Sequence, residues 1–424
     1  MRVVYLAAGA AGMYCGSCLH DNRLAATLRA QGRDVVLVPL YTPLRTDESD
    51  VSTRRVYFGG INVYLQQTAA LFRHTPAFVD RLLDAPALLR SVGRFAAQTR
   101  PEVLGEFTLS VLQGEQGRQR KELQKLVAGL RALQPSLVHL PNLMFVGLAP
   151  ALKTTLHVPV LCSLTGEDIF LDRLPEAYRR PVFKLIQERV GDIDGFVALT
   201  DYYARHATGH FGLPASRVHR VPMGIRAADF ERPARPAARP FTIGYLARVC
   251  PEKGLAELVQ AFIVLRQRAR ACRLRAAGYL GTADKPYLAR ILDALRAERW
   301  HDGFEYVGEV SRDQKLEFLQ SLDVLSVPAA YPESKGFYVL EALAAGVPVV
   351  QPAHGSFPEL ITATGGGVLY EPGNVAALAD ALAGLMDDAP RRQQLAAQGR
   401  AAVHRDFTAE RMADEAWRLY EQFV

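Results

Sequence analysis

The sequence predicts an α/β protein made of two domains, each built on a parallel sheet, and three observations carry that prediction. Short apolar runs typical of strands alternate with helical patterns along most of the chain. The alternation stops at a proline-rich stretch, residues 232–240, and starts again after it. A chain of 424 residues is also too long for one hydrophobic core and long enough for two or three domains.

The first half opens with a strand at residues 3–8, a loop at 9–16 and a helix at 21–30. Gly32 ends that helix, and residues 35–38 form the next strand. A strand, a crossover helix and a second strand predict a right-handed parallel unit. Further strands are expected at residues 137–140, 158–162, 195–199 and 218–221.

Residues 41–130 interrupt this alternation. The run of glycine, β-branched and aromatic residues at 59–65 suggests a hairpin or a pair of strands, whereas residues 71–131 look mainly helical. Many arginines lie beside the apolar positions of the helical part. This insertion is either a solvated helical face over a core or a subdomain that binds a substrate or touches a membrane.

The second half resumes directly after the proline-rich linker. Strands are expected at residues 241–246, 274–277, 304–307, 324–327, 347–350 and 367–369. Ligands of open α/β sheets bind outside the carboxyl ends of the strands. Two such domains joined by a stiff linker therefore predict a cleft that holds a ligand.

The segment at residues 331–350 is the most informative part of the chain. Glu333 and Glu341 lie eight positions apart, with a turn centred on Gly336 between them. From Phe337 onward the apolar spacing is helical, so a helix begins just after the turn. The N–H groups and partial positive charge of a helix N-terminus can hold a phosphate. With a carboxylate on each side of this phosphate site, the segment is predicted to bind a diphosphate whose two ends carry hydroxyl-rich groups.

Arg248 and Lys253 follow the strand at 241–246, in a turn shaped by Pro251 and Gly254. Two fixed cations at the end of a strand can stabilise the charge that builds on a departing diphosphate. Two surface cations that cap loops are the alternative. The carboxylate segment favours the diphosphate interpretation.

Composition narrows the class of partner and compartment. The net charge is +6 and the pI about 9.0, but no zinc finger, basic helix or aromatic–basic strand predicts nucleic-acid binding. A small polyanion or an anionic membrane surface fits the charge equally well. The start of the chain does not look like a signal peptide, and no apolar run reaches membrane-spanning length, so a cytoplasmic protein is expected.

The motifs together resemble the retaining glycosyltransferases of family 4, which have the two-domain GT-B fold. The residues that carry the likeness are Arg248, Lys253-Gly254, Glu333, Glu341 and Gly346-Val347-Pro348. It is nearly continuous over residues 241–407 and weaker in the first half. It implies two Rossmann-like domains facing across a cleft, with no metal required and no cofactor.

The resemblance also implies domain boundaries. Residues 1–231 would form an acceptor-binding domain that contains the insertion at 41–130, and residues 232–240 the linker. Residues 241–405 would form the nucleotide-sugar-binding domain. A C-terminal helix at 406–424 would cross back to the first domain.

Catalytic roles follow from the same resemblance. Arg248 and Lys253 would bind the diphosphate, and Glu333 would contact hydroxyls of the donor sugar beside the reacting carbon. Glu341 would accept hydrogen bonds from the nucleotide ribose. The acceptor would attack from the leaving-group face, with a phosphate oxygen taking its proton.

Backbone groups complete the implied substrate site. The N–H groups of Gly336, Phe337 and Tyr338 would hold the distal phosphate. Gly12 and Gly16 would let the N-terminal loop approach the phosphates closely, because glycine has no side chain.

Two positions depart from the family pattern. Lys335 replaces a residue that is usually aromatic, and Thr165 stands where a histidine is expected. Thr165 and His139 are therefore candidate substrate contacts, although a structural role for His139 is an alternative. Glu167 and Asp168 either take over hydrogen bonding to the substrate or belong to an ordinary loop.

The implied function is transfer of a hexose-type sugar from a nucleotide-diphosphate sugar to an unidentified acceptor, which is a glycan, a lipid-linked molecule or a small molecule. No nucleic-acid partner is expected. Peripheral contact with the inner face of a membrane stays open.

Several alternatives remain at this point. Residues 55–66 are similar to a segment of glycogen and starch synthases, so a glucan acceptor is one of them. A nucleotide-sugar epimerase of the same fold is another, and a non-catalytic glycan-binding protein a third. A dinucleotide-dependent oxidoreductase is disfavoured because the first loop lacks the G-x-G-x-x-G spacing.

The five cysteines do not predict a disulfide framework. Cys15 and Cys18 form a C-x-x-C pair in the loop expected to face phosphates. Zinc would need a second pair, and a redox role would need a suitable context. Plain loop residues are the alternative.

Overall fold

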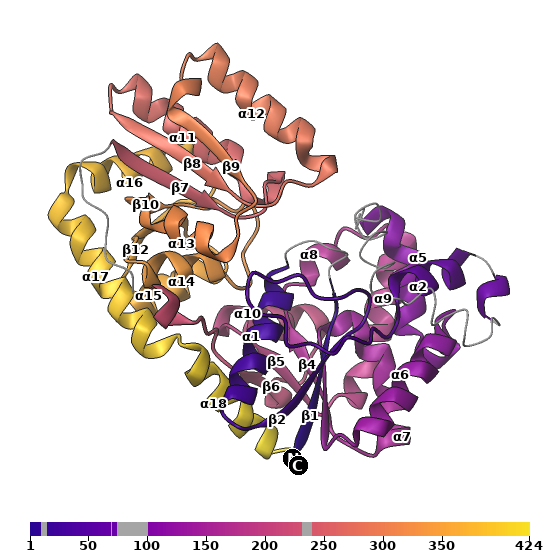
Figure 1. Cartoon of the computed structure of the whole chain (residues 1–424). Coiled ribbons are helices and arrows are strands. Elements are labelled where there is room, and N and C mark those ends of the chain that lie inside the picture. The colour runs from indigo at the N-terminus through magenta and orange to yellow at the C-terminus, as the bar shows by residue number, and fades with distance from the viewer. Residues whose placement is uncertain (10–14, 69, 74–100, 231–239) are drawn as a thin grey trace. The chain divides into compact units, whose positions relative to one another are not determined.

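The computed structural model describes residues 1–9, 15–68, 70–73, 101–230 and 240–424. The chain divides into two compact units. Unit 1 comprises Met1–Pro222 and Glu410–Val424, and unit 2 comprises Met223–Ala409 (Figure 1). The segment predicted as a linker lies, apart from Pro240, outside the described residues, as does part of the predicted insertion.

Unit 1 is built on a parallel six-stranded sheet in the order β2-β1-β3-β4-β5-β6. Its strands are β1 (Arg2–Ala7), β2 (Asp34–Pro39), β3 (Leu137–Leu140), β4 (Val160–Leu164), β5 (Gly195–Ala198) and β6 (Val218–Arg220). Strands β1, β3, β4 and β5 are buried along almost their whole length, as expected of a parallel sheet covered on both faces.

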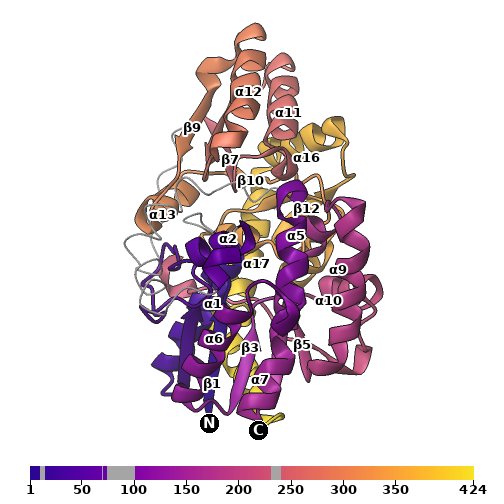
Figure 2. The ribbon, with the colours of Figure 1, turned by 90° about the vertical axis from the view of Figure 1, so that its right-hand side faces the viewer.

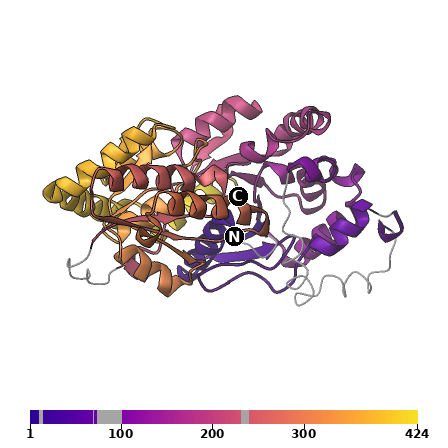
Figure 3. The ribbon, with the colours of Figure 1, turned by 90° about the horizontal axis from the view of Figure 1, so that it is seen from above.

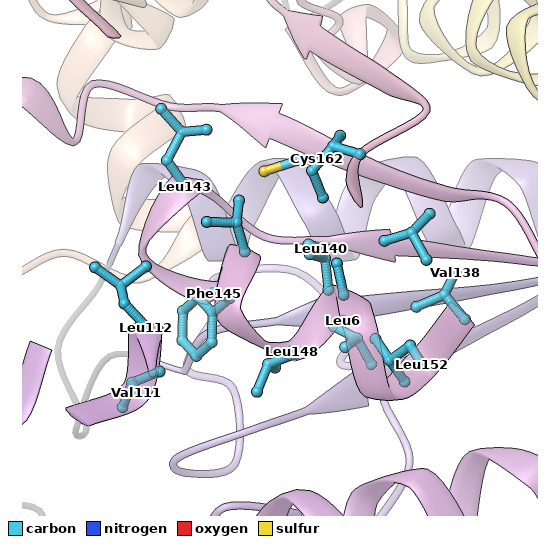
Figure 4. Close-up of a cluster of buried hydrophobic side chains, with 14 of the residues drawn as sticks. Leu6, Val111, Leu112, Val138, Leu140, Leu143, Phe145, Leu148, Leu152 and Cys162 are labelled. Carbon is cyan, nitrogen blue, oxygen red and sulfur yellow. The ribbon is translucent and has the colours of Figure 1, made fainter. Parts of the chain in front are cut away.

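Helices and short helical turns cover this sheet. The α-helices of unit 1 are α1 (Gly16–Ala30), α2 (Gly60–Thr68), α5 (Pro101–Leu112), α6 (Arg120–Leu133), α7 (Ala149–Leu156), α8 (Asp168–Leu171), α9 (Glu176–Arg189), α10 (Asp201–Phe211) and α18 (Ala409–Glu421). Helices α6 and α7 lie side by side over the sheet (Figure 2). Leucine and valine side chains from β1, β3, α5 and α7 form the core between these layers, together with Phe145 of the 3-10 turn Leu143–Leu148 (Figure 4).

The last helix belongs to unit 1. Helix α18 begins at the end of unit 2 and packs against α1 and the sheet of unit 1, where Gln31 donates a hydrogen bond to Asp414 (3.2 Å). The Arg33 guanidinium lies 4.8 Å from the centre of the Trp417 ring. The two ends of the chain therefore lie close together at one end of unit 1 (Figure 3).

Unit 2 repeats the architecture with the order β12-β11-β10-β7-β8-β9, again parallel. Its strands are β7 (Phe241–Leu246), β8 (Cys272–Ala277), β9 (Phe304–Gly308), β10 (Val324–Leu325), β11 (Val349–Pro352) and β12 (Gly367–Tyr370). Its helices are α11 (Leu255–Gln267), α12 (Lys285–Ala297), α13 (Arg312–Gln320), α14 (Phe337–Ala344), α15 (Phe357–Thr364), α16 (Val375–Asp387) and α17 (Ala389–Asp406). Within the described ranges, none of the helices is both long enough and apolar enough to span a bilayer.

The predicted hairpin at residues 59–65 is wrong, because this segment forms helix α2. Asn62, Val63 and Gln66 are buried, which is one face of a helix. The Gln66 side chain donates a hydrogen bond to Glu122 of α6 (2.7 Å). Contacts with residues distant in the sequence thus override the strand preference of the β-branched and aromatic residues.

Strand β4 begins two residues later than predicted. Pro159 has no N–H and cannot donate to the sheet, so pairing with β3 starts at Val160. The Val160 N–H also donates to the Asp194 carboxylate (2.8 Å). Helix α1, in turn, begins at Gly16, five residues before the predicted start.

Candidate active site

The loop after β7 brings Lys253 to the end of the neighbouring strand β10. A short 3-10 turn, Pro251–Lys253, leads into Gly254, whose φ of +72° is unfavourable for other residues. A Cβ atom on Gly254 would lie 1.8 Å from the Pro328 carbonyl oxygen, so only glycine permits this approach. Lys253 therefore reaches the segment that follows β10.

There Lys253 forms an ion pair with Glu333, and the two side chains are 18% and 6% exposed. The hydroxyls of Tyr331 and Tyr338 donate to the same carboxylate at 3.4 and 3.3 Å. The Lys253 Nζ atom lies 4.9 Å from the centre of the Tyr331 ring and 5.6 Å from that of Tyr338. We call these four residues, Lys253, Tyr331, Glu333 and Tyr338, the ion-pair cluster.

Electrostatics keep both partners charged. Burial disfavours the ionised form of Glu333, but the charge of Lys253 outweighs it and lowers the pKa of the carboxyl below its ordinary value. Burial likewise opposes the charge on Lys253, yet Glu333 raises the pKa of the ammonium. Burial also raises the pKa of Tyr331 to about 12, and the pKa of Tyr338 is raised too, so both remain hydrogen-bond donors.

The main chain around Glu333 is held by Ser356, which precedes α15. The Ser356 N–H donates to the Glu333 carbonyl oxygen (2.8 Å), and its hydroxyl donates to that of Lys335 (2.6 Å). Lys335, a departure from the family pattern, is also close enough to Glu333 to contribute to the lowered pKa. The carboxylate thus has a fixed position on a short loop.

Helix α14 begins directly after this loop. Gly336 occupies the position before its first turn with a φ of +100°, and Phe337 and Tyr338 are its first two residues. The N–H groups at such a start have no acceptors within the helix. The structure therefore brings the ion-pair cluster and a helix N-terminus together, which is an arrangement suited to a bound anion.

Glu341 lies farther along α14, where it meets two cations that sequence reasoning missed. Its Oε1 atom accepts a hydrogen bond from Lys315 Nζ (2.7 Å) and lies 3.9 Å from the Arg312 guanidinium. The side chains of Glu341 and Lys315 are only 9% and 8% exposed. Arg312 also pairs with Asp229 (2.5 Å). A lysine on α13 gives no local signal of a partner 26 residues away.

Arg248 does not contact the ion-pair cluster directly. Its Nε donates to Cys250 Sγ (3.2 Å), its guanidinium lies 3.8 Å from Glu252, and the side chain is 46% exposed. It follows β7, as predicted, and Lys253 follows five positions later. Both cations therefore lie at the same edge of the sheet, but the Lys253 side chain is more buried than that of Arg248.

The candidate residues of unit 1 lie in a different setting. Gly12 is outside the described residues, and Gly16 is the first residue of α1. The N–H of Thr165 donates to Glu167 (2.7 Å), whose other oxygen accepts from the Leu143 N–H (3.1 Å). Asp168 accepts from the Tyr203 hydroxyl (2.8 Å). Glu167 therefore tethers two loops, which favours the loop interpretation for this carboxylate.

His139 is a buried residue of β3, inside unit 1. Its Nδ1 is hydrogen-bonded to the Tyr420 hydroxyl (2.9 Å) and its Nε2 to the Ser163 hydroxyl (3.0 Å). The Tyr5 hydroxyl lies 3.0 Å from Ser163 and donates to Asp21 (3.0 Å). Burial lowers the pKa of His139 to about 3, so the ring is neutral. We call these five residues the interior cluster; their geometry favours a structural role for His139 over substrate contact.

No group of three or more histidine, cysteine, aspartate and glutamate side chains able to hold a metal ion occurs within the described ranges.

Two family models match the chain. The model of the glycosyl transferases group 1 matches residues 228–402, and the model of glycosyltransferase family 4 matches residues 95–229. The two matches meet near the start of unit 2 and together span most of the sequence. The chain therefore belongs to the group 1 and family 4 glycosyltransferases.

Relatives and solved structures agree with this assignment. The chain is 26% identical to a glycogen synthase of Mycobacterium tuberculosis, over 68% of this chain and 69% of the relative. It is 27% identical to a GDP-mannose-dependent alpha-(1-6)-phosphatidylinositol monomannoside mannosyltransferase of the same species, over 60% and 67%.

The fold matches that of sucrose-phosphate synthase from Thermosynechococcus elongatus, with a TM-score of 0.71, 17% identity, and coverage of 100% of this chain and 98% of that one. Anabaena HepE in complex with UDP gives a TM-score of 0.70 at 14% identity, with both chains fully covered. The predicted fold class, two Rossmann-like domains of the GT-B type, is confirmed.

Proposed function

We propose that this chain is a retaining glycosyltransferase that moves a sugar from a nucleotide-diphosphate sugar to an acceptor hydroxyl. The observation that carries the proposal is the buried Lys253–Glu333 ion pair at the start of α14. Relatives and structural neighbours support the donor class, because one relative is GDP-mannose-dependent and solved neighbours hold UDP or UDP-glucose.

The leaving diphosphate would be stabilised from unit 2. As the bond between the sugar C1 and the phosphate oxygen breaks, negative charge builds on the diphosphate. Lys253 and Arg248 would offset that charge, and the N–H groups of Gly336, Phe337 and Tyr338 would donate to the distal phosphate. These groups lie on loops attached to the sheet, so little reorganisation is needed during the reaction.

Glu333 would bind the donor sugar as a carboxylate. Its lowered pKa keeps it ionised at neutral pH, so it accepts hydrogen bonds from sugar hydroxyls and does not supply a proton. The proton of the acceptor hydroxyl would pass to an oxygen of the leaving phosphate as the new C1–O bond forms on the same face. This route retains the anomeric configuration.

The ribose would be held by Glu341. Lys315 fixes the orientation of this carboxylate through a 2.7 Å hydrogen bond, and Arg312 connects it to Asp229, close to where the chain enters unit 2. Lys315 and Arg312 would therefore act as positioning residues for the nucleotide. Acceptor binding would fall to unit 1, where Thr165 would contact the acceptor.

The proposal is tested by incubating the protein with UDP-glucose, GDP-mannose and ADP-glucose, with and without glycan, lipid-linked and small-molecule acceptors. Release of nucleoside diphosphate only with an acceptor, and a product whose anomeric configuration by NMR matches the donor, are expected. An inverted product would contradict the retaining mechanism. A changed sugar without acceptor would instead support an epimerase. Turnover should persist in EDTA, because the proposal assigns no metal.

A glucan synthase-like activity is the second candidate, favoured by the 26% identity to glycogen synthase over about two thirds of both chains. It predicts that a maltooligosaccharide primer is elongated with ADP-glucose or UDP-glucose. If the primer is not elongated but sugar is transferred to a lipid-linked acceptor, the result would instead favour a glycosyltransferase that acts at the inner face of a membrane.

A further inference from the structure

Cys15 and Cys18 lie at the beginning of α1, on either side of Gly16, and neither thiol has a role in the proposed transfer reaction. Cys15 is the residue that precedes the helix, with extended backbone angles (φ −122°, ψ 125°), and Cys18 is in the first turn. Cys15 is partly exposed, whereas Cys18 is only 2% exposed. Cys15 is thus the more exposed of the two residues.

The two thiols contact one another. The Cys18 side chain is hydrogen-bonded to that of Cys15, and a backbone hydrogen bond from Gly9 at the end of β1 also reaches it. The contact with Cys15, burial and the charge of Asp21 together raise the pKa of Cys18. All five cysteines are thiols in the structure, and Cys162, Cys250 and Cys272 are buried in other elements.

We propose that Cys15 and Cys18 form a reversible redox site whose oxidant is a low-molecular-weight disulfide. Cys15 is the more exposed of the two residues and directly precedes the first turn of α1. The thiolate form of a cysteine is the attacking species in such an exchange. The Cys15 thiolate attacks one sulfur of the disulfide, which forms a mixed disulfide and releases one thiolate.

Cys18 then completes the exchange. Its sulfur attacks Cys15, the bond to the small thiol breaks, and the Cys18 proton leaves with that second thiolate. The net change converts two protein thiols and one disulfide into one protein disulfide and two small thiols. Because the pair is separated by only two residues on one helical turn, the second step needs no rearrangement of the fold.

The test uses the full chain equilibrated with defined ratios of reduced and oxidised glutathione, quenched in acid, alkylated and digested. The expected result is loss of two hydrogen atoms from the peptide that carries Cys15 and Cys18, reversed by dithiothreitol. The Cys18→Ser variant should accumulate glutathione on Cys15, and the Cys15→Ser variant should leave Cys18 reduced. Cys272→Ser serves as the control and should keep the Cys15–Cys18 disulfide.

Either a stable mixed disulfide on Cys15 in the wild-type chain or alkylation of both thiols at every glutathione ratio would overturn the proposal. A disulfide that joins Cys18 to another cysteine would do so as well. These readouts follow the chemistry of the thiols and do not depend on the proposed transfer reaction.

Discussion

The interior cluster of unit 1 and the ion-pair cluster of unit 2 are both buried and polar, but they differ in charge and in what surrounds them. The interior cluster has a neutral histidine whose two nitrogens are taken by Tyr420 and Ser163, between the sheet and α18. The ion-pair cluster contains a full charge on each partner, at the end of the strands and beside a helix start.

The difference separates a structural polar network from a candidate site. Buried polar groups that satisfy one another specify how elements pack, here how α18 sits on unit 1. A buried charge pair costs desolvation and is often no better for stability than apolar residues. The Lys253–Glu333 pair, at the carboxyl ends of the strands, is therefore the stronger candidate for a ligand site.

The largest expected effect is at the ion pair itself. Glu333→Gln and Lys253→Ala should each reduce turnover at least about 100-fold, because each removes a group that acts on the developing charge or the sugar. Lys253→Ala should also cost roughly 3–5 kcal/mol of stability, since a buried carboxylate loses its partner. Steady-state kinetics and urea unfolding measure both quantities.

The double variant Lys253→Ala/Glu333→Gln is the control for this experiment. It should recover part of the stability, because no unpaired charge remains, but none of the turnover. Near-normal turnover in both single variants would contradict the assignment of Lys253 and Glu333 to the active site.

The next effect is the response of unit 1 to acid. The pKa of His139 falls from an ordinary value of 6.5 to about 3 in the folded protein, so the unfolded chain binds the additional proton. Stability should therefore fall by about 1.4 kcal/mol per pH unit from pH 6.5 toward 3. Glu333, with a lowered pKa, contributes fully above its ordinary pKa and loses that contribution only as pH falls through its folded value.

The acid-induced loss of stability can be followed separately in each unit, because one of the two tryptophans, Trp417, lies in unit 1 and the other, Trp300, in unit 2. In a Trp300→Phe background, Trp417 fluorescence should report acid destabilisation beginning near pH 6.5. His139→Gln should flatten that slope. An unchanged slope would show that another group binds the proton.

A smaller effect is expected at the start of α14. Gly336→Ala should cost about 1–3 kcal/mol, because the residue has a φ of +100° and the new Cβ would lie 3.1 Å from Leu360 Cδ1. Turnover should also fall as the phosphate-facing N–H groups shift. Gly373→Ala is matched, with a φ of +74° and no atom within 4 Å of the new Cβ. It should cost stability but leave turnover intact; equal kinetic losses would contradict the role of Gly336.

The smallest expected effect compares one hydroxyl in each cluster. Tyr420→Phe removes the hydrogen bond to His139 and should cost about 1–2 kcal/mol while turnover is retained. Tyr338→Phe removes a hydrogen bond to Glu333 and should lower kcat/KM with a similar loss of stability. Thermal unfolding and kinetics on both variants test this contrast, which fails if Tyr420→Phe is the one that impairs turnover.

Sequence reasoning succeeded where the signal is local. The strands at Leu137–Leu140 and Phe241–Leu246 were predicted with their observed bounds, because buried parallel strands are short apolar runs between helices. The helix start after Gly336 was equally clear, since glycine and the apolar spacing that follows it mark such a boundary. The pair Lys253 and Glu333 was placed at one site through the family resemblance.

Sequence reasoning failed where a distant partner decides the outcome. The segment at 59–65 has strand-forming residues, yet a hydrogen bond from Gln66 to Glu122 and the burial of one face make it helical. His139 was a candidate substrate contact, but Tyr420, almost three hundred residues later, occupies one of its nitrogens. Lys315 was not predicted as a site residue, although it donates a hydrogen bond to Glu341.

By itself, the sequence determined the two α/β domains, the helix start at Gly336 and the residue types that an anionic sugar donor needs, because periodicity, turns and glycines act over a few neighbouring residues. Only the tertiary structure decided which polar residues meet. It placed His139, as a neutral ring, in a buried hydrogen-bond network, gave Glu333 and Glu341 their lysine partners, and set the Cys18 thiol against that of Cys15. Such pairings depend on which strands and helices become neighbours, and side-chain charge and burial take their values only there.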